Sequence, residues 1–265
     1  MTQPNGQTKT DEDFSSKQQD EQGVNKSKDR VQTMFSEIAD KYDRMNHLLS
    51  MNVDYYWRRR TVRKTAPEPE GPILDLCTGT GDLAFAYYKY IQKKGRKTNR
   101  PVAPLVGADF CKEMLDVAEV KKEKLGIQTG LSFVEADAMN LPFDDEQFQL
   151  ISVAFGLRNV ADTDAGLREM VRVCRPGGQL AVLEFSMPRW QPMKFFYQWY
   201  FKNILPRIGQ LFAKNQQSAY QYLPDSVQTF PAYEALAQKM KKAGLRHVTF
   251  YPLTFGISTL YIGTK

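Results

Sequence analysis

The chain has 265 residues, of which 42% are hydrophobic and 25% charged, and it contains no run of about 20 apolar residues that would span a bilayer. Three separated cysteines and two histidines give no disulfide framework and no multi-histidine metal site, and the net charge of +6 is too diffuse to indicate a nucleic-acid partner. We therefore expect a cytoplasmic protein with one large domain, no metal and no bound nucleic acid.

The N-terminal 30 residues are rich in Gln, Asp, Ser, Lys and Asn. They contain too few large apolar side chains to offset the entropy lost on folding, so we predict a disordered tail over 1–30 and one domain over 31–265. From residue 31 onward, apolar side chains recur at helical spacing: Met34, Phe35, Ile38, Tyr42 and Met45. This spacing predicts an amphipathic helix, the first of the lid helices expected over 31–66, which packs on the domain or covers a cleft.

Predicted strands and helices then alternate along the chain. A strand, a glycine turn and a helix are predicted within 73–90, and a further helix is predicted from about Cys111 to near Gly126. Four more apolar segments are predicted to be strands: Leu105–Asp109, Leu131–Glu135, Phe148–Ala154 and Gln179–Phe185. This alternation predicts a parallel sheet with right-handed crossovers.

The C-terminal third continues the pattern. Four apolar side chains share one face of a predicted helix: Leu167, Met170, Val171 and Cys174. We expect Pro176-Gly177-Gly178 to end that helix, and Pro231 to open a later helix that Gly244 closes. Two final strands, Arg246–Tyr251 and Ile257–Gly263, are expected to form a hairpin at one edge of the sheet.

A glycine turn in the segment LDLCTGTGD lies where the first predicted strand meets the first helix, which is where open α/β sheets bind ligands. Gly79 and Gly81 allow the backbone to approach a ligand closely, because neither has a Cβ and both tolerate positive φ. The spacing Gly79-x-Gly81-x-x-Ala84 also satisfies the loose dinucleotide fingerprint. The glycines alone therefore do not separate a nicotinamide cofactor from S-adenosylmethionine.

Acidic residues in or after three successive strands favour S-adenosylmethionine. Asp75, inside the first strand, is expected to accept hydrogen bonds from the ammonium of a methionine moiety, whereas it would repel a pyrophosphate. Asp109 is expected to bind both ribose hydroxyls. Asp137 is expected to reach the adenine edge beside an apolar wall of Ala138 and Met139. The alternative is that these carboxylates only cap the following helices.

Several segments resemble the ubiquinone/menaquinone biosynthesis C-methyltransferase family over about residues 31–265: MFSEIADKYDRMNHLLS, LDLCTGTGD, LPFDDEQFQLISVAFGLRNV and LREMVRVCRPGGQLAVLEFSMP. The segment GLRN, Gly156–Asn159, is more specific than the glycine turn. The resemblance implies a Rossmann-like class I fold with a mostly parallel seven-stranded sheet and helices on both faces. It also implies cofactor contacts at Thr80, Asp109, Asp137 and Ala138, with no metal.

The implied reaction moves a methyl group from S-adenosylmethionine to a ring carbon of a reduced prenylated quinone precursor; the resemblance favours demethylmenaquinol, which would become menaquinol, and leaves the ubiquinone precursor as a further acceptor. Ring carbon becomes nucleophilic when a neighbouring hydroxyl ionises. We expect Arg158 to stabilise that anion, directly or through a water whose uptake of the proton it assists, Asn159 to orient a ring oxygen, and Tyr42 to close over the site. The alternative for Arg158 is a structural ion pair with Asp162 or Asp164.

Aromatic and basic residues mix in two segments, PRWQPMKFFYQWYFKNILPRIGQLF and YYWRRRTVRK. The first belongs to an aromatic helical insertion predicted over 188–225, and both are typical of peripheral contact with the inner face of a membrane. Core packing with a solvated basic face is the alternative. A homo-oligomer is a further expectation.

Two other functions remain open at this point. A nicotinamide-dependent oxidoreductase would use the same glycine turn, but no proton-donor constellation accompanies it. A methyltransferase-like lipid-binding or assembly protein without turnover would keep the fold and lose the chemistry, although the segment GLRN and the glycine turn are both intact.

Overall fold

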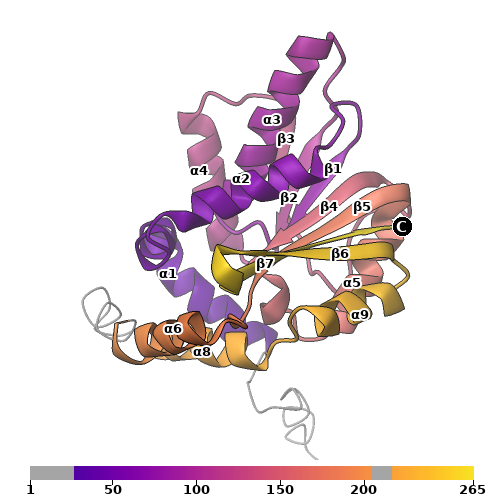
Figure 1. Ribbon diagram of the computed structural model, residues 1–265. Helices are drawn as coiled ribbons and strands as arrows, with labels where there is room; N and C mark the ends of the chain where they lie inside the picture. The colour runs from indigo at the N-terminus through magenta and orange to yellow at the C-terminus, as the bar shows by residue number, and fades with distance from the viewer. Residues whose placement is uncertain (1–26, 205–216) are drawn as a thin grey trace, which may run out of the picture.

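The computed structural model describes residues 27–204 and 217–265, so nearly all of the predicted tail and part of the predicted insertion lie outside the described residues. The described chain forms one seven-stranded sheet in the order β3-β2-β1-β4-β5-β7-β6 (Figure 1). The strands are β1 (Ile73–Leu76), β2 (Leu105–Asp109), β3 (Leu131–Glu135), β4 (Phe148–Ala154), β5 (Cys174–Phe185), β6 (Arg246–Leu253) and β7 (Ser258–Thr264).

Strands β1 to β5 run parallel, and β1 lies between β2 and β4. All four residues of β1 are buried, as expected of a parallel strand covered on both faces. Strand β7 is inserted antiparallel between β5 and β6, where Leu260 pairs with Leu183 on one side and with Tyr251 on the other. The predicted mostly parallel sheet and its C-terminal hairpin are thus both confirmed.

Helices cover both faces of the sheet (Figure 1). They are α1 (Lys28–Leu49), α2 (Val53–Thr65), α3 (Asp82–Thr98), α4 (Lys112–Lys124), α5 (Thr163–Val173), α6 (Gln191–Asn203), α8 (Gln217–Thr229) and α9 (Glu234–Lys242). Helices α2 and α3 pack on one face, where Trp57 and Ile91 join a cluster with strand residues such as Leu150. Helices α5 and α9 pack on the other.

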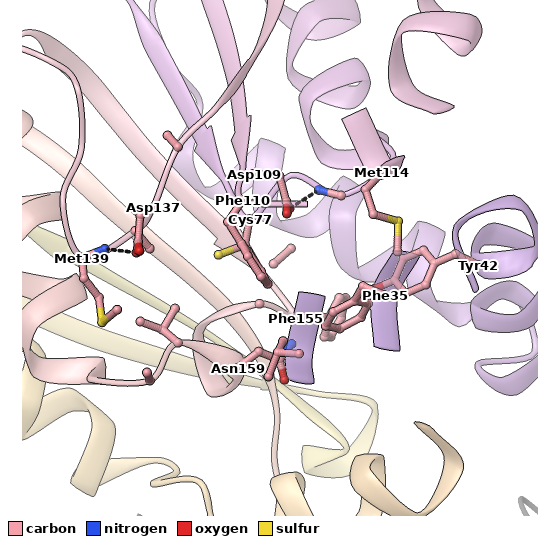
Figure 2. A pocket seen from close by; sticks show the side chains of 18 residues that line it. Phe35, Tyr42, Cys77, Asp109, Phe110, Met114, Asp137, Met139, Phe155 and Asn159 are labelled. Atoms are coloured by element: carbon pink, nitrogen blue, oxygen red, sulfur yellow. Dashed lines mark hydrogen bonds between the residues drawn. The ribbon is translucent and has the colours of Figure 1, made fainter. Parts of the chain in front are cut away.

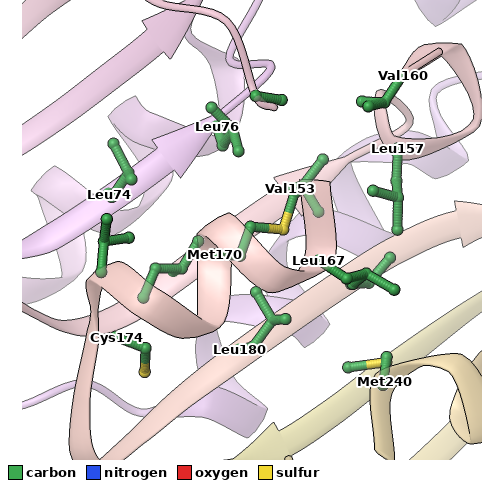
Figure 3. Close-up of a cluster of buried hydrophobic side chains, with 14 of the residues drawn as sticks. Leu74, Leu76, Val153, Leu157, Val160, Leu167, Met170, Cys174, Leu180 and Met240 are labelled. Atoms are coloured by element: carbon green, nitrogen blue, oxygen red, sulfur yellow. The ribbon is translucent and has the colours of Figure 1, made fainter. Parts of the chain in front are cut away.

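The core beneath α5 shows why the sequence folds this way. Leu167 and Met170 recur at helical spacing and point at the sheet, where they meet Val153 and Leu180 (Figure 3). Met240 of α9 joins the same cluster. Burial of this apolar stripe, rather than helix propensity, fixes α5 on the sheet.

Three sequence predictions about element ends were wrong. Helix α5 ends at Val173, so Cys174 belongs to β5, and the Pro176-Gly177-Gly178 segment lies inside that strand because it hydrogen-bonds with Lys265. Helix α9 begins at Glu234 rather than at Pro231. Tyr233 intervenes with a φ of 54°, and its backbone N–H donates to the Tyr261 hydroxyl. Helix α1 begins at Lys28, within the range predicted to be tail.

Helices α1 and α2 occupy the range predicted for the lid. Ile38 and Met45 of α1 pack against Met114 of α4, and the Tyr200 hydroxyl of α6 donates to the Leu49 carbonyl at 3.0 Å. Because α4 follows β2, this packing sets α1 across the carboxyl ends of the strands. Within residues 27–204 and 217–265, no helix combines the length and the apolar character needed to cross a membrane.

Replacing Leu167 with Ala should lower the free energy of unfolding by about 2–5 kcal/mol, because this side chain is fully buried beneath α5. Urea unfolding followed by circular dichroism measures the change. Arg168→Ala alters the neighbouring exposed residue and should change the free energy of unfolding by no more than about 0.5 kcal/mol. Equal losses in the two variants would contradict this packing.

Candidate active site

A cleft of about 70 Å³ opens at the carboxyl ends of the central strands (Figure 2). Asp109 and Phe110 line it at the end of β2, and Asp137 and Met139 line it on the opposite side from Tyr42, which reaches in from α1. Sequence reasoning expected a ligand at this edge, and the structure brings those predicted residues to one cleft.

The glycine turn after β1 forms the floor of this cleft. Gly79 has a φ of 56°. Apart from the glycine and its two chain neighbours, no atom of the described residues lies within 4 Å of the position that a Cβ would take, so a side chain there would project into open space. The Gly79 N–H donates to the Asp109 carboxylate at 2.8 Å, which ties the turn to β2. The cleft is therefore shaped so that a ligand lies directly against the backbone of the turn.

Gly81 shapes the start of α3. It precedes α3 with a φ of 84°, and an added Cβ would come within 2.9 Å of both Phe85 and Phe133. It lines neither the cleft nor the neighbouring cavity. Gly81 thus serves the turn and its packing on the aromatic rings, and its contact with a cofactor stays a prediction.

Asp109 is buried and accepts hydrogen bonds from the backbone N–H groups of Gly79 and Cys111, the latter at 3.0 Å. Burial raises the pKa of Asp109 to about 6, and these hydrogen bonds only partly oppose the rise. Asp137 accepts from the Met139 N–H at 2.9 Å, beside the apolar wall that includes Ala138. No helix directly follows Asp137, so helix capping does not account for it.

Asp75 lies deeper in the fold. Its two oxygens accept hydrogen bonds from Ser152 at 2.6 Å and Thr78 at 2.7 Å, and burial raises its pKa to about 6. Asp75 borders the second cavity rather than the cleft around Asp109. In the structure this carboxyl joins the glycine turn to β4, and its contact with an ammonium group stays a prediction.

The second cavity adjoins the cleft and has a volume of about 220 Å³. Its walls come from α1, α2, α6 and α8, and they are largely apolar. Apolar and aromatic lining residues include Met34, Ile38, Leu49, Trp57, Phe185, Phe196, Tyr197 and Leu223. Phe35, Tyr42, Cys77, Gly79 and Phe155 line both spaces, so a ligand in one lies next to a ligand in the other.

Arg158 borders this second cavity from the short 3-10 turn η3 (Leu157–Asn159). It is buried, and its Nη1 donates to Glu184 at 2.8 Å and to the Phe155 carbonyl. Burial by itself would lower the pKa of Arg158, but the Glu184 carboxylate together with Tyr42 and Tyr222 more than offsets it, so the net direction is upward. Within the described chain, Arg158 Nε is buried without a hydrogen-bond partner.

The partners that the sequence suggested for Arg158 were wrong. Asp162 instead accepts from the Ala165 N–H as the N-cap of α5, and Asp164 pairs with Lys239 at 2.8 Å. Sequence reasoning missed Glu184, although a single acid in the apolar segment LAVLEF marks a buried charge that needs a partner.

Asn159 and Tyr42 occupy positions consistent with the roles predicted for them. The Asn159 side chain faces the cleft, and its Oδ1 accepts from the Tyr222 hydroxyl of α8 at 3.1 Å. No pattern in the sequence pointed to Tyr222. Tyr42 lines both spaces, and burial raises its pKa, so the phenol stays protonated and able to donate.

A polar network fastens α1 to the site. Thr80 donates to Asp43 at 2.5 Å, and Lys121 of α4 reaches the same Asp43 carboxylate at 2.9 Å. Thr80 also faces the second cavity. A cofactor that bound the Thr80 hydroxyl, as predicted, would compete with Asp43 of α1 for the same hydrogen bond.

Near this network, His47, Asp54 and Asp82 come close enough together to share a cation. Arg58 already occupies that position, with nitrogens 2.5 Å from Asp54 and 3.0 Å from Asp82. The guanidinium supplies the positive charge that these carboxylates require.

The doubly wound sheet, the open glycine turn after β1 and the acids at the carboxyl ends of β2 and β3 define a Rossmann-like methyltransferase that uses S-adenosylmethionine. Solved structures with this fold include a SAM-dependent methyltransferase of Thermotoga maritima, with a TM-score of 0.59, 19% identity and coverage of 89% of this chain and 99% of that one. Another, from Aquifex aeolicus, has a TM-score of 0.54 and 15% identity, and the match covers 78% and 88% of the two chains.

The chain belongs to the ubiE/COQ5 methyltransferase family, whose model matches residues 22–265. A demethylmenaquinone methyltransferase of Thermus thermophilus is 44% identical over 232 residues, 88% of this chain and all of the relative. A ubiquinone/menaquinone biosynthesis C-methyltransferase of Geotalea daltonii is 40% identical over 89% of this chain and 97% of the relative. The family predicted from the sequence is confirmed.

Binding of S-adenosylmethionine should weaken by about tenfold between about pH 7.5 and about pH 5. The pKa of Asp109 is raised to about 6, so its carboxyl takes up a proton as the pH falls through that value and no longer accepts two hydroxyl hydrogen bonds. Calorimetric titration measures the affinity. Asp109→Asn should remove most of this pH dependence, whereas an unchanged dependence would assign it to another group such as Asp75.

Proposed function

We propose that the protein methylates a ring carbon of demethylmenaquinol, a reduced prenylated naphthoquinone. The proposal rests on one arrangement: an acidic cleft adjoins a larger apolar cavity, and the buried Arg158 faces that cavity. The names of its relatives support the naphthoquinone as acceptor. Membership in the methyltransferase family disfavours both a nicotinamide oxidoreductase and a protein without turnover.

The residues of the cleft fit S-adenosylmethionine. Asp109 would hold the ribose, Asp137 and Ala138 the adenine, and the bare backbone at Gly79 leaves room for the rest of the molecule. When bound, the sulfonium supplies a methyl group that is already activated for transfer. The chain itself therefore needs to position the acceptor carbon at about 3 to 3.5 Å and to keep water out, and no protein nucleophile is required.

Arg158 would favour ionisation of the ring hydroxyl. Loss of the hydroxyl proton to water places negative charge on oxygen and electron density on the adjacent carbon. A permanent positive charge in a buried site stabilises that charge strongly. Because Glu184 keeps the guanidinium protonated, Arg158 acts by electrostatics and orients the water that carries the proton away. Methyl transfer to the adjacent ring carbon would break the carbon–sulfur bond as the new carbon–carbon bond forms, and the ring carbon would then pass its proton to water, which restores the aromatic ring.

Tyr42 and Asn159 would place the ring. Tyr42 lines both spaces and carries a protonated hydroxyl, so it closes the boundary between donor and acceptor. Tyr222 fixes the oxygen of the Asn159 amide, which leaves its amino group to donate to a ring oxygen.

The prenyl tail would leave along the aromatic helix α6. Phe196 and Tyr197 line the apolar cavity, while Phe195 on the same helix is 74% exposed. An exposed aromatic surface beside a lipid-binding cavity is typical of contact with a bilayer interface. We therefore propose that the enzyme works in peripheral contact with the inner, cytoplasmic face of the membrane. The predicted homo-oligomer stays a prediction.

Incubating the protein with labelled S-adenosylmethionine and a panel of reduced demethylated naphthoquinones and benzoquinones tests the proposed acceptor. We expect mass spectrometry to find one added methyl on the naphthoquinol ring. Exclusive methylation of a benzoquinol would reassign the substrate, and cofactor binding without methylation of any quinol would contradict the function.

Arg158→Gln should reduce kcat by at least about a hundredfold while leaving the affinity for S-adenosylmethionine nearly unchanged, because Arg158 does not line the cofactor cleft. The single change also leaves Glu184 buried without a countercharge, which lowers stability. The double variant Arg158→Gln/Glu184→Gln removes that unpaired charge. We expect it to regain stability and to stay inactive; recovery of turnover with stability would show that Arg158 is only structural.

A further inference from the structure

A basic groove runs between α2 and α3, on the face of the sheet opposite α5 and α9. It has a volume of about 720 Å³, and eight of its fifteen lining residues are Arg or Lys, whereas one, Asp82, is acidic. Arg58 and Lys121 both pair with Asp82, and Lys94 pairs with Glu68. The only acid of the groove is thus already neutralised.

Five of these cations have no ion pair within the described chain: Arg59, Arg63, Lys89, Lys93 and Lys97. All five are exposed and four residues apart, so they form one stripe on α2 and one on α3. Like charges at this spacing destabilise a helix, and the fold does not compensate for them. The two stripes therefore present unneutralised positive charge to an external anion.

The neighbouring residues indicate which kind of anion fits. Tyr55 lines the groove and is 55% exposed, and the adjacent Tyr56 is also exposed. Met51, just before α2, borders the apolar cavity and is 70% exposed. Helix α2 thus separates the basic groove from the proposed quinone cavity, with exposed aromatic and apolar side chains near its start. Basic and aromatic side chains side by side suit the headgroup layer of a bilayer.

We propose that anionic phospholipid headgroups bind in the groove between α2 and α3 and hold the enzyme against the membrane. The proposal rests on the proposed function, because a membrane-soluble acceptor gives the docking its purpose. With the headgroups in the groove, the Met51 side of α2 faces the bilayer and the quinone ring enters the apolar cavity without leaving the lipid. Each basic side chain near an anionic surface strengthens binding about fivefold.

Cosedimentation of the full chain with vesicles tests this surface. Vesicles of phosphatidylcholine containing phosphatidylglycerol should bind the protein, and pure phosphatidylcholine should bind it much less. Changing Arg59, Arg63, Lys89, Lys93 and Lys97 to Gln should lower the vesicle partition coefficient by at least about a hundredfold. Added salt should likewise lower the partition coefficient of the unmodified chain.

A matched control removes five exposed cations from other parts of the surface, mostly on α5 and α9: Arg168, Arg175, Lys241, Lys242 and Arg246, each changed to Gln. The net charge falls equally, so an equal loss of vesicle binding would overturn the groove as a specific surface. Binding to a single-stranded oligonucleotide, but not to anionic vesicles, would overturn the proposal in favour of a nucleic-acid partner.

A detergent-free assay with a short-chain demethylated quinol separates this proposal from the proposed function. The groove variant should methylate the short-chain quinol at the unmodified rate and lose activity only on substrate embedded in anionic vesicles. Unchanged activity on the embedded substrate would overturn the docking proposal. If the unmodified chain did not methylate the short-chain quinol, that result would instead contradict the proposed function.

Discussion

The ion pair between Arg158 and Glu184 is the interaction on which the site depends. Both side chains are buried, so each charge would be costly without the other. Glu184 belongs to β5 and Arg158 to the turn after β4, so the pair joins two adjacent strand ends and places a permanent cation at the wall of the apolar cavity. Glu184 also accepts from the backbone N–H groups of Arg158 and Phe185, which fixes the carboxylate itself. The rigidity of this corner suits the electrostatic role proposed for Arg158, because the charge is oriented before a substrate binds.

Much of the fold was readable from the sequence, because its signals are local. The bounds of β2, β3 and β4 coincide with the predicted apolar runs. The errors fall where a distant contact overrides the local pattern. Cys174 continues the helical spacing of α5, yet pairing with Phe148 draws it into β5. Pro231 is a reasonable helix start, but Tyr261 holds Tyr233 in a conformation that delays the helix.

The candidate site could be predicted in part, namely where a local sequence pattern marks its residues. Asp109 ends one predicted strand and Asp137 follows the next, and the carboxyl ends of parallel strands converge, so topology brings the two residues together. The partners of these residues were not readable. Glu184 lies 26 residues from Arg158 and Tyr222 lies 63 residues from Asn159, distances over which no spacing rule applies. The packing role of Gly81 was not readable, because a glycine in a turn gives the same sequence signal whether it makes room for a ligand or for Phe133.

Helix α1 has a consequence for how ligands are exchanged. Phe35 and Tyr42 form walls of both the cleft and the apolar cavity, and Asp43 ties the same helix to Thr80 in the glycine turn. Moving α1 outward to admit a ligand on one side removes contacts from the other side as well. The free energy needed to move α1 outward thus depends on the contacts in both spaces. A ligand bound in either space therefore changes the free energy needed to release a ligand from the other. Because α1 forms part of both the cleft and the apolar cavity, entry and release of a ligand in one space are coupled to entry and release in the other.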